Sequence, residues 1–327
     1  MASLPIRCSV PYASAMRTVW TMGFVATAAL GFCFPDYQVF RFTQAAIWAL
    51  ALLGLVVLCG MSGQFSFAQA AFWGMGGYTA AIVGAHTPLS PYCSLLLAPL
   101  VGFGAGYGIG RIASAHSIWT QALVSYAIVI AFPQLLRWRV IEHWTGGVQG
   151  LYLDAPPPPI PGLSADRWCF LMTLALLGLG LLLVDNIGRG RPGRALRAAR
   201  DHDLAAEAQG IRVVHVRSVA SGLAGAFIAL AGCLSAFQFG FVGPTAYNFQ
   251  LSMQMLFGSV IGGMYSLAGP FLGGLFLEFF PAVTASIGKG LSSLLYAVLL
   301  IAAIVAMPDG LAGALARAAR RLKLREL

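Results

Sequence analysis

Apolar stretches long enough to cross a lipid bilayer follow one another along this chain of 327 residues. A bilayer's hydrocarbon core is about 30 Å thick, and a helix needs about 20 mostly apolar residues to cross it. Only 9% of the residues are charged, whereas soluble domains carry about 25%. We therefore predict an all-α polytopic membrane protein, one transmembrane domain over residues 1–327, with about 8–10 membrane segments including broken or re-entrant helices. The candidate segments are 18–34, 43–61, 72–86, 92–112, 117–136, 168–185, 217–239, 250–282 and 291–307.

The positive charges predict how these segments are oriented. If the chain starts in the cytoplasm, fifteen of its 20 Lys and Arg residues fall on the cytoplasmic side, where such residues are enriched in membrane proteins. We therefore predict cytoplasmic termini, a cytoplasmic loop at 186–216 and an external loop at 137–166. Four prolines at 156–159 favour an extended arm in that external loop. No small-residue cleavage site follows the first apolar run, so we expect an uncleaved first span.

The cytoplasmic loop contains the most charged stretch, Arg189–Arg217, with seven Arg residues and the acids Asp201, Asp203 and Glu207. Pro192 stands where a helix can begin, and Gly210 stands where one can end. We expect one short helix or two outside the bilayer, with Arg200 and Asp203 as neighbours at i,i+3. Such an element is suited to binding a soluble partner.

Two glycine-rich segments interrupt the apolar runs, one at 62–78 and one at 262–266 within 250–282. The number of crossings between Arg217 and the tail must be even, so we predict a broken or re-entrant hairpin over 250–282. Irregular backbone at membrane depth occurs only where it is buried in protein or lines a cavity. We therefore predict that the substrate pathway includes Gly63, Gln64, Ser66, Gln69, Gly76, Gly77, Gly262, Gly263, Tyr265 and Ser266. The alternative for any one glycine is close helix packing through small residues.

Several classes of chemistry have no support in the sequence. No phosphate-binding loop is present, since Gly288-Lys289-Gly290 lacks the upstream glycine, and the Cys and His residues lack metal-ligand spacing. We expect no enzyme activity, no metal and no cofactor bound by this chain. The net charge of +9 follows the membrane topology, so we expect no nucleic-acid partner. Glu278 leaves a proton-coupled carrier open, but Pro281 follows closely, so we favour a Glu that reaches the membrane interface.

The run GRALRAARDHDLAAEAQGI (193–211) resembles the cytoplasmic loop of M-type permeases from ATP-driven branched-chain amino acid importers. In that family an Ala-Ala-Glu-Ala-x-Gly-Ile core forms a coupling helix that docks on the ATPase subunit. Four further segments resemble family motifs in the same order, at 63–82, 145–151, 259–274 and 307–313. The resemblance implies that the ATPase-coupling residues are Asp203, Ala205, Ala206, Glu207, Gly210 and Ile211.

The resemblance also implies partners and a location. The chain would sit in the bacterial inner membrane, surrounded by lipid, with a second homologous permease, two ATPase subunits that use ATP and Mg²⁺, and a periplasmic solute-binding protein. The solute would be a branched-chain or related hydrophobic amino acid. Ala68 and Gln69 replace the family's Gly-His, and Tyr265 replaces a Gly, so urea or short amides remain an alternative. A stand-alone channel, a proton-coupled carrier and a membrane scaffold are the alternatives from other classes.

Overall fold

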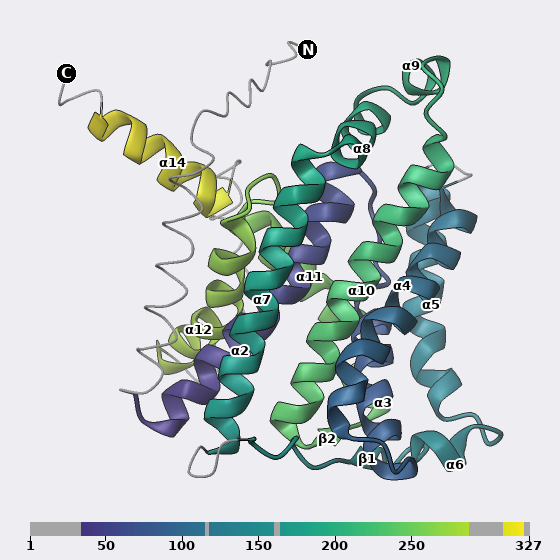
Figure 1. Cartoon of the computed structure of the whole chain (residues 1–327), viewed down its shortest axis with the longest axis vertical. Helices are drawn as coiled ribbons and strands as arrows, with labels where there is room; N and C mark the ends of the chain where they lie inside the picture. The colour runs from purple at the N-terminus through teal and green to yellow at the C-terminus, as the bar shows by residue number, and fades with distance from the viewer. Residues whose placement is uncertain (1–33, 115–117, 160–163, 288–309, 324–327) are drawn as a thin grey trace.

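The computed structural model describes residues 34–114, 118–159, 164–287 and 310–323, and most of them are helical (Figure 1). Five helical segments in this part of the chain are long and apolar enough to span a membrane. They are α2 with its continuation η1 (Asp36–Leu55, Val56–Met61), η2 with α4 (Pro91–Cys93, Ser94–Ala113), α5 (Ile118–Leu136), α7 (Ala165–Arg189) and α10 (Val213–Phe239). The prediction of an all-α polytopic protein is confirmed. The expected spans at 18–34 and 291–307 lie outside the described residues, apart from Phe34.

The long helices run along the same axis, and the two expected loops lie at opposite ends of it (Figure 1). One end carries α8 (Arg191–Asp201), α9 (Asp203–Ala208) and α14 (Gly310–Lys323). The other end carries α6 (Glu142–Thr145) and two short strands, β1 (Leu151–Tyr152) and β2 (Phe241–Val242), which pair antiparallel. This two-residue pairing was not expected from the sequence. It joins the 137–166 loop to the chain that follows α10.

Three helices extend beyond the apolar spans expected from the sequence. Helix α2 begins at Asp36 rather than at 43, so Arg41 lies inside a helix. Helix α7 continues to Arg189 and α10 starts at Val213, so both enter the predicted 186–216 loop. An apolar run predicts only the apolar part of a helix. The helix itself can continue beyond that run as polar turns at either end.

Helix α10 is the centre of the bundle, and glycines bring other helices against its backbone. On α4, a Cβ at Gly102 would lie 2.4 Å from the carbonyl oxygen of Gly225, and one at Gly106 would lie 2.4 Å from that of Ser221. On α3 (Gln69–His86), Gly76 approaches the backbone of Ala229 in the same way. Small residues at such positions let membrane helices approach closely, and van der Waals contact then stabilises the pair.

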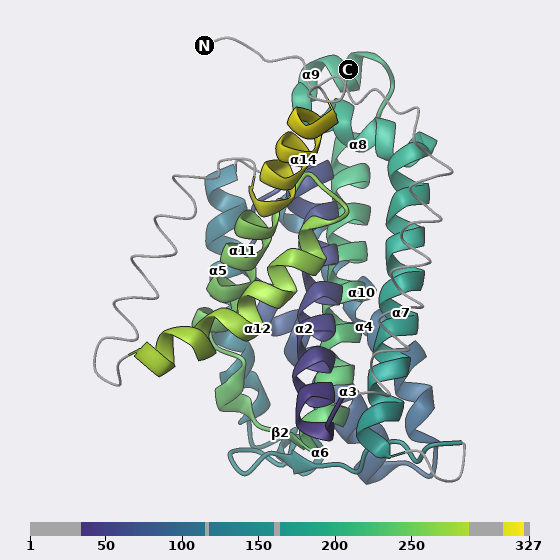
Figure 2. The same cartoon turned by 90° about the vertical axis from the view of Figure 1, so that its left-hand side faces the viewer.

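Two stretches of irregular backbone interrupt the helices. The first break, residues 62–68, separates η1 from α3, and Gly63 adopts a left-handed φ of 69° there. The second break, residues 263–268, separates α11 (Phe249–Gly262) from α12 (Gly269–Ile287). At the second break Gly263 has φ 106°, the chain reverses, and α12 packs beside α11 and α2 (Figure 2). The predicted interruption of 250–282 is therefore confirmed, and it takes the form of a helical hairpin.

An ion pair ties this hairpin to α2. The Nε of Arg41 donates to Oε1 of Glu278 at 3.0 Å, and Nη2 of Arg41 donates to the Glu278 carbonyl oxygen at 3.1 Å. The Arg41 guanidinium also lies 4.4 Å from the centre of the Phe279 ring. Glu278 thus has a fixed cationic partner, and the two side chains are only 21% and 18% exposed.

Replacing Glu278 with Ala is expected to destabilise the protein by about 1–3 kcal/mol, because it leaves the half-buried Arg41 guanidinium without its carboxylate. Thermal unfolding in detergent measures this loss. The exposed pair between Asp36 and Arg167 (3.4 Å) provides the control, since Asp36→Ala should change stability little. Equal shifts in the two variants would contradict the role given to the Arg41–Glu278 pair.

Candidate functional site

The charged loop folds into two short helices, as expected. Pro192 occupies the first turn of α8, where its missing N–H costs nothing. His202 has extended backbone (φ −154°, ψ 109°) and separates α8 from α9. Gly210 takes a left-handed φ of 82° after α9, so the chain can turn back into α10.

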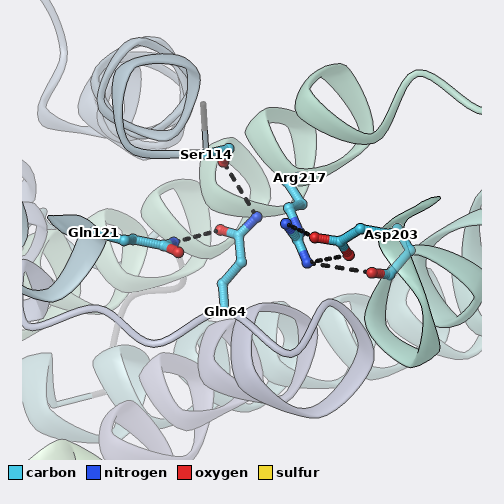
Figure 3. A network of polar contacts seen from close by, with 6 residues as sticks. Gln64, Ser114, Gln121, Asp203 and Arg217 are labelled. Atoms are coloured by element: carbon cyan, nitrogen blue, oxygen red, sulfur yellow. Dashed lines mark hydrogen bonds and ion pairs between the residues drawn. The ribbon is translucent and has the colours of Figure 1, made fainter. Parts of the chain in front are cut away.

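Arg217 holds these two helices against the start of α10. Its Nη1 and Nη2 donate to the two carboxylate oxygens of Asp203 at 2.8 and 2.7 Å, and Nη2 also donates to the Ala199 carbonyl oxygen at 3.2 Å (Figure 3). Beneath this fork Ala199, Ala206 and Val213 form a small buried cluster. Bidentate guanidinium–carboxylate contacts fix geometry as well as adding energy. We call α8, α9 and the first turn of α10 the coupling unit.

The expected pairing of Arg200 with Asp203 was wrong. An i,i+3 contact needs a continuous helix, but the extended backbone at His202 interrupts the helix between the two residues. Asp203 pairs instead with Arg217, 14 residues further on. Arg200 points into the bundle, where its Nη1 donates to the Gly60 carbonyl oxygen at 2.6 Å.

The outer surface of α9 is exposed. Among the residues implied by the resemblance, Ala206 is buried in the coupling unit and Ile211 is half-buried, whereas Asp203, Ala205, Glu207 and Gly210 are exposed. Leu204, which sequence reasoning missed, is 83% exposed beside them. The tip of α9 therefore exposes the apolar side chain of Leu204 and the carboxylate of Glu207, and the Arg217–Asp203 contact holds this helix in place. A role in docking stays a prediction for these residues.

The first break is lined by buried polar side chains. Gln64 is 3% exposed; its Oε1 accepts from Nε2 of Gln121 at 3.1 Å, and its Nε2 donates to Oγ of Ser114 at 3.5 Å (Figure 3). Gln121 comes from α5 and Ser114 caps the end of α4. Sequence reasoning missed both, although a Gln within the apolar run 117–136 was a visible signal.

Neighbouring helices also satisfy backbone groups of the break and of the first turn of α3. The amide of Phe67 donates to Oγ of Ser125 on α5 at 3.0 Å, and the amide of Ala70 donates to Oγ of Ser252 on α11 at 3.0 Å. Gln69 donates to the Ser66 carbonyl oxygen at 2.6 Å, while its own Oε1 is buried and has no partner among the described residues. The two serine hydroxyls supply partners that helix hydrogen bonds would otherwise provide, as irregular backbone buried in protein requires. Ser125 and Ser252 were also missed.

The two breaks lie against each other. A Cβ on Gly60, at the end of η1, would lie 2.1 Å from the carbonyl oxygen of Met264 in the second break. Tyr265 in that break is 63% exposed. The structure therefore places the second break, with the predicted pathway residues Gly263, Tyr265 and Ser266, against the end of η1 that precedes Gly63, Gln64 and Ser66. The remaining two predicted residues are helical, since Gln69 begins α3 and Gly262 ends α11.

Gly76 and Gly77 belong to a different environment. Gly76 packs on the Ala229 backbone of α10, and a Cβ at Gly77 would lie 2.7 Å from the Tyr247 hydroxyl. Close packing, the alternative weighed from the sequence, accounts for both glycines, and a pathway role for them stays a prediction. In the part of the chain that the structure describes, no three His, Cys, Asp or Glu residues are grouped so that they could hold a metal ion.

Comparison with known proteins gives a family match and several relatives. The family model for the branched-chain amino acid transport system permease component matches residues 39–304. LivM of Salmonella typhimurium, a high-affinity branched-chain amino acid transport system permease protein, is 26% identical over 251 residues, which cover 68% of this chain and 58% of LivM.

Two further relatives differ in what their names specify. BraD of Pseudomonas aeruginosa, also a high-affinity branched-chain amino acid transport system permease protein, is 25% identical over 293 residues, or 83% of this chain and 93% of BraD. The autoinducer 2 import system permease protein LsrC of Klebsiella pneumoniae is 32% identical over 179 residues, or 52% and 51%. No solved structure matches the chain. The aligned segment spans little more than half of LivM, the first of these relatives.

Proposed function

The chain belongs to the family of branched-chain amino acid transport system permease components, and from this premise we propose that it is the membrane-spanning subunit of an ATP-driven importer. The observation that carries the proposal is the coupling unit. It projects from one end of a bundle of apolar helices, is fixed by the Arg217–Asp203 fork, and exposes Leu204 and Glu207 at its tip. Such a unit can transmit movement from a soluble subunit to the helices.

The proposed partners are two ATPase subunits, a second homologous permease and a periplasmic solute-binding protein. ATP-driven closure of the ATPase pair would displace α9, and the coupling unit would carry this displacement to the spans. In this mechanism Glu207 and its neighbours transmit force and perform no chemistry. ATP and Mg²⁺ are used by the partners.

The proposed solute is a branched-chain or related hydrophobic amino acid. The names of LivM and BraD support this class, whereas LsrC, a permease for autoinducer 2 import, shows that relatives serve other solutes. The buried amides of Gln64, in the first break, and of Gln69, the first residue of α3, are compatible with a polar group on the solute. Urea or a short amide is therefore the second candidate.

Reconstitution tests the proposal against a channel or carrier that works alone. Liposomes holding only this chain and its sister permease should not accumulate radiolabelled leucine. Addition of the ATPases, the binding protein and ATP should start uptake, and competition by leucine but not by urea would identify the solute class. Solute flux through this chain alone would overturn the proposal.

The proton-coupled alternative rests on Glu278, which the structure places in an ion pair with Arg41. Glu278→Gln keeps an oxygen that can accept from Arg41 but removes the titrating group. We expect ATP-driven uptake by this variant to keep the pH dependence of the native importer. A change in that dependence, together with uptake driven by a pH gradient alone, would favour the carrier.

A further inference from the structure

Arg200 is the residue of α8 that joins the coupling unit to both breaks. Its Nη1 donates to the carbonyl oxygen of Gly60 at 2.6 Å, at the end of η1 and just before the first break. The same guanidinium lies 4.6 Å from the centre of the Tyr265 ring in the second break. This side chain of α8 thus contacts two parts of the molecule that are far from α8, and from each other, in the sequence.

Two glycines next to Arg200, Gly60 and Gly63, leave no space for a side chain of their own. A Cβ at Gly63 would lie 2.7 Å from Cγ of Arg200, and Gly63 also has a left-handed φ of 69° that disfavours any other residue. A Cβ at Gly60 would meet the Met264 carbonyl oxygen at 2.1 Å. Both glycines therefore allow Arg200 and the second break to lie directly against the first.

The contacts of Arg200 with Gly60 and Tyr265 are of strong types, a hydrogen bond from a cation and a cation–π contact. The last carbonyls of a helix lack partners within the helix, and the Gly60 oxygen at the end of η1 accepts from a charged donor instead. A hydrogen bond from a cation is about twice as strong as a neutral one. The guanidinium also lies over the Tyr265 ring, a position that an ammonium group would fill less well.

The backbone of Arg200 is also fixed within the coupling unit. It follows Ala199, whose side chain lies in the buried cluster of the coupling unit and whose carbonyl oxygen accepts from Arg217. The Arg217 fork binds Asp203, the first residue of α9. A displacement of α9 is therefore passed to Arg200 through short, polar contacts.

We propose that Arg200 is the positioning residue through which the coupling unit moves both breaks together. The guanidinium pulls on the end of η1 through the Gly60 oxygen and on the turn between α11 and α12 through Tyr265. The polar first break and the hairpin then shift in step with α9. This inference deepens the proposed importer function and rests on it.

The test uses the full importer in liposomes and measures three quantities, namely assembly with the ATPases, ATP hydrolysis and solute uptake. Arg200→Met should assemble normally and hydrolyse ATP within about twofold of the native rate, but its uptake per ATP should fall about tenfold or more. Arg200→Lys should restore only part of the uptake, because an ammonium lacks the planar fork. The matched control is Arg197→Met, which removes the same charge from an exposed position one turn earlier and should leave uptake unchanged.

Tyr265 gives a second set of variants that does not depend on folding of the Arg200 variant, since its ring is 63% exposed. Tyr265→Leu should lower uptake per ATP, and Tyr265→Phe, which keeps the ring, should lower it less. Tyr265→Leu should lower uptake per ATP less in the Arg200→Met background than in the native chain, because both substitutions remove the same contact. The inference would be overturned if Arg200→Met showed the native uptake per ATP. If Arg200→Met does not fold, native uptake per ATP in Tyr265→Leu would overturn it.

Hydrogen exchange on the purified chain separates failure of this inference from failure of the proposed function. Arg200→Met should speed exchange in residues 56–68 and 263–268 relative to Arg197→Met, without any partner present. If the native chain never drives ATP-dependent uptake but this exchange effect is seen, the importer function fails and the physical link stands. If exchange is the same in the two variants, the link itself is wrong.

Discussion

Charge reversal at Glu207 is expected to abolish ATP-driven uptake while the protein stays folded in the membrane. Glu207 is exposed on α9, and the packing of that helix is supplied by Ala206 on its other face. Glu207→Arg should therefore leave the coupling unit intact. A like charge placed at a docking surface costs several kcal/mol, which corresponds to a loss of binding of about 100-fold or more.

Uptake and co-purification of the ATPases measure this effect. Arg191→Glu is the control, because it also reverses an exposed charge but lies at the opposite end of α8 from α9. It should retain most of the uptake. If Glu207→Arg takes up solute at the native rate, the coupling residues have been assigned to the wrong surface.

Replacing Gly106 with Val is expected to prevent the bundle from forming. The Cβ alone would lie 2.4 Å from the Ser221 carbonyl oxygen on α10, and a backbone atom cannot rotate away as a side chain can. The helices would have to separate, at a cost of about 3 kcal/mol or more, because overpacking of a tight core is strongly unfavourable. The yield of monodisperse protein in detergent measures the loss.

Gly108 provides a closely matched control. It lies on the same helix two residues later, and no described atom comes within 4 Å of the Cβ position there. Both Gly→Val substitutions have the same intrinsic effect on the helix, so any difference comes from the contact with α10. Equal yields of Gly106→Val and Gly108→Val would show that the two helices do not meet as described.

Much of the fold follows from local signals in the sequence. The lengths of the apolar runs predicted the long helices, and the positions of Pro192 and Gly210 predicted the start of α8 and the turn after α9. The glycine-rich interruptions predicted both breaks. These features depend on residues close together in the chain.

Contacts between distant residues could not be predicted in this way. Asp203 was matched with the wrong arginine because its partner lies beyond the turn at Gly210. The pair between Arg41 and Glu278 joins residues 237 positions apart. Likewise, the hydroxyl of Ser125 reaches the first break and that of Ser252 reaches the start of α3 only because the fold places α5 and α11 beside them. The sequence shows which residues are polar, but only the packing shows which backbone groups they satisfy.

The glycines of α4 have a consequence for motion. Helices that meet through side chains can slide past one another as those side chains change rotamer. At Gly102 and Gly106 the meeting surfaces are main chain on main chain, with nothing that can rotate out of the way. We therefore expect α4 and α10 to move as one rigid body throughout a transport cycle. Any opening of the bundle should then occur at the contacts between other helices.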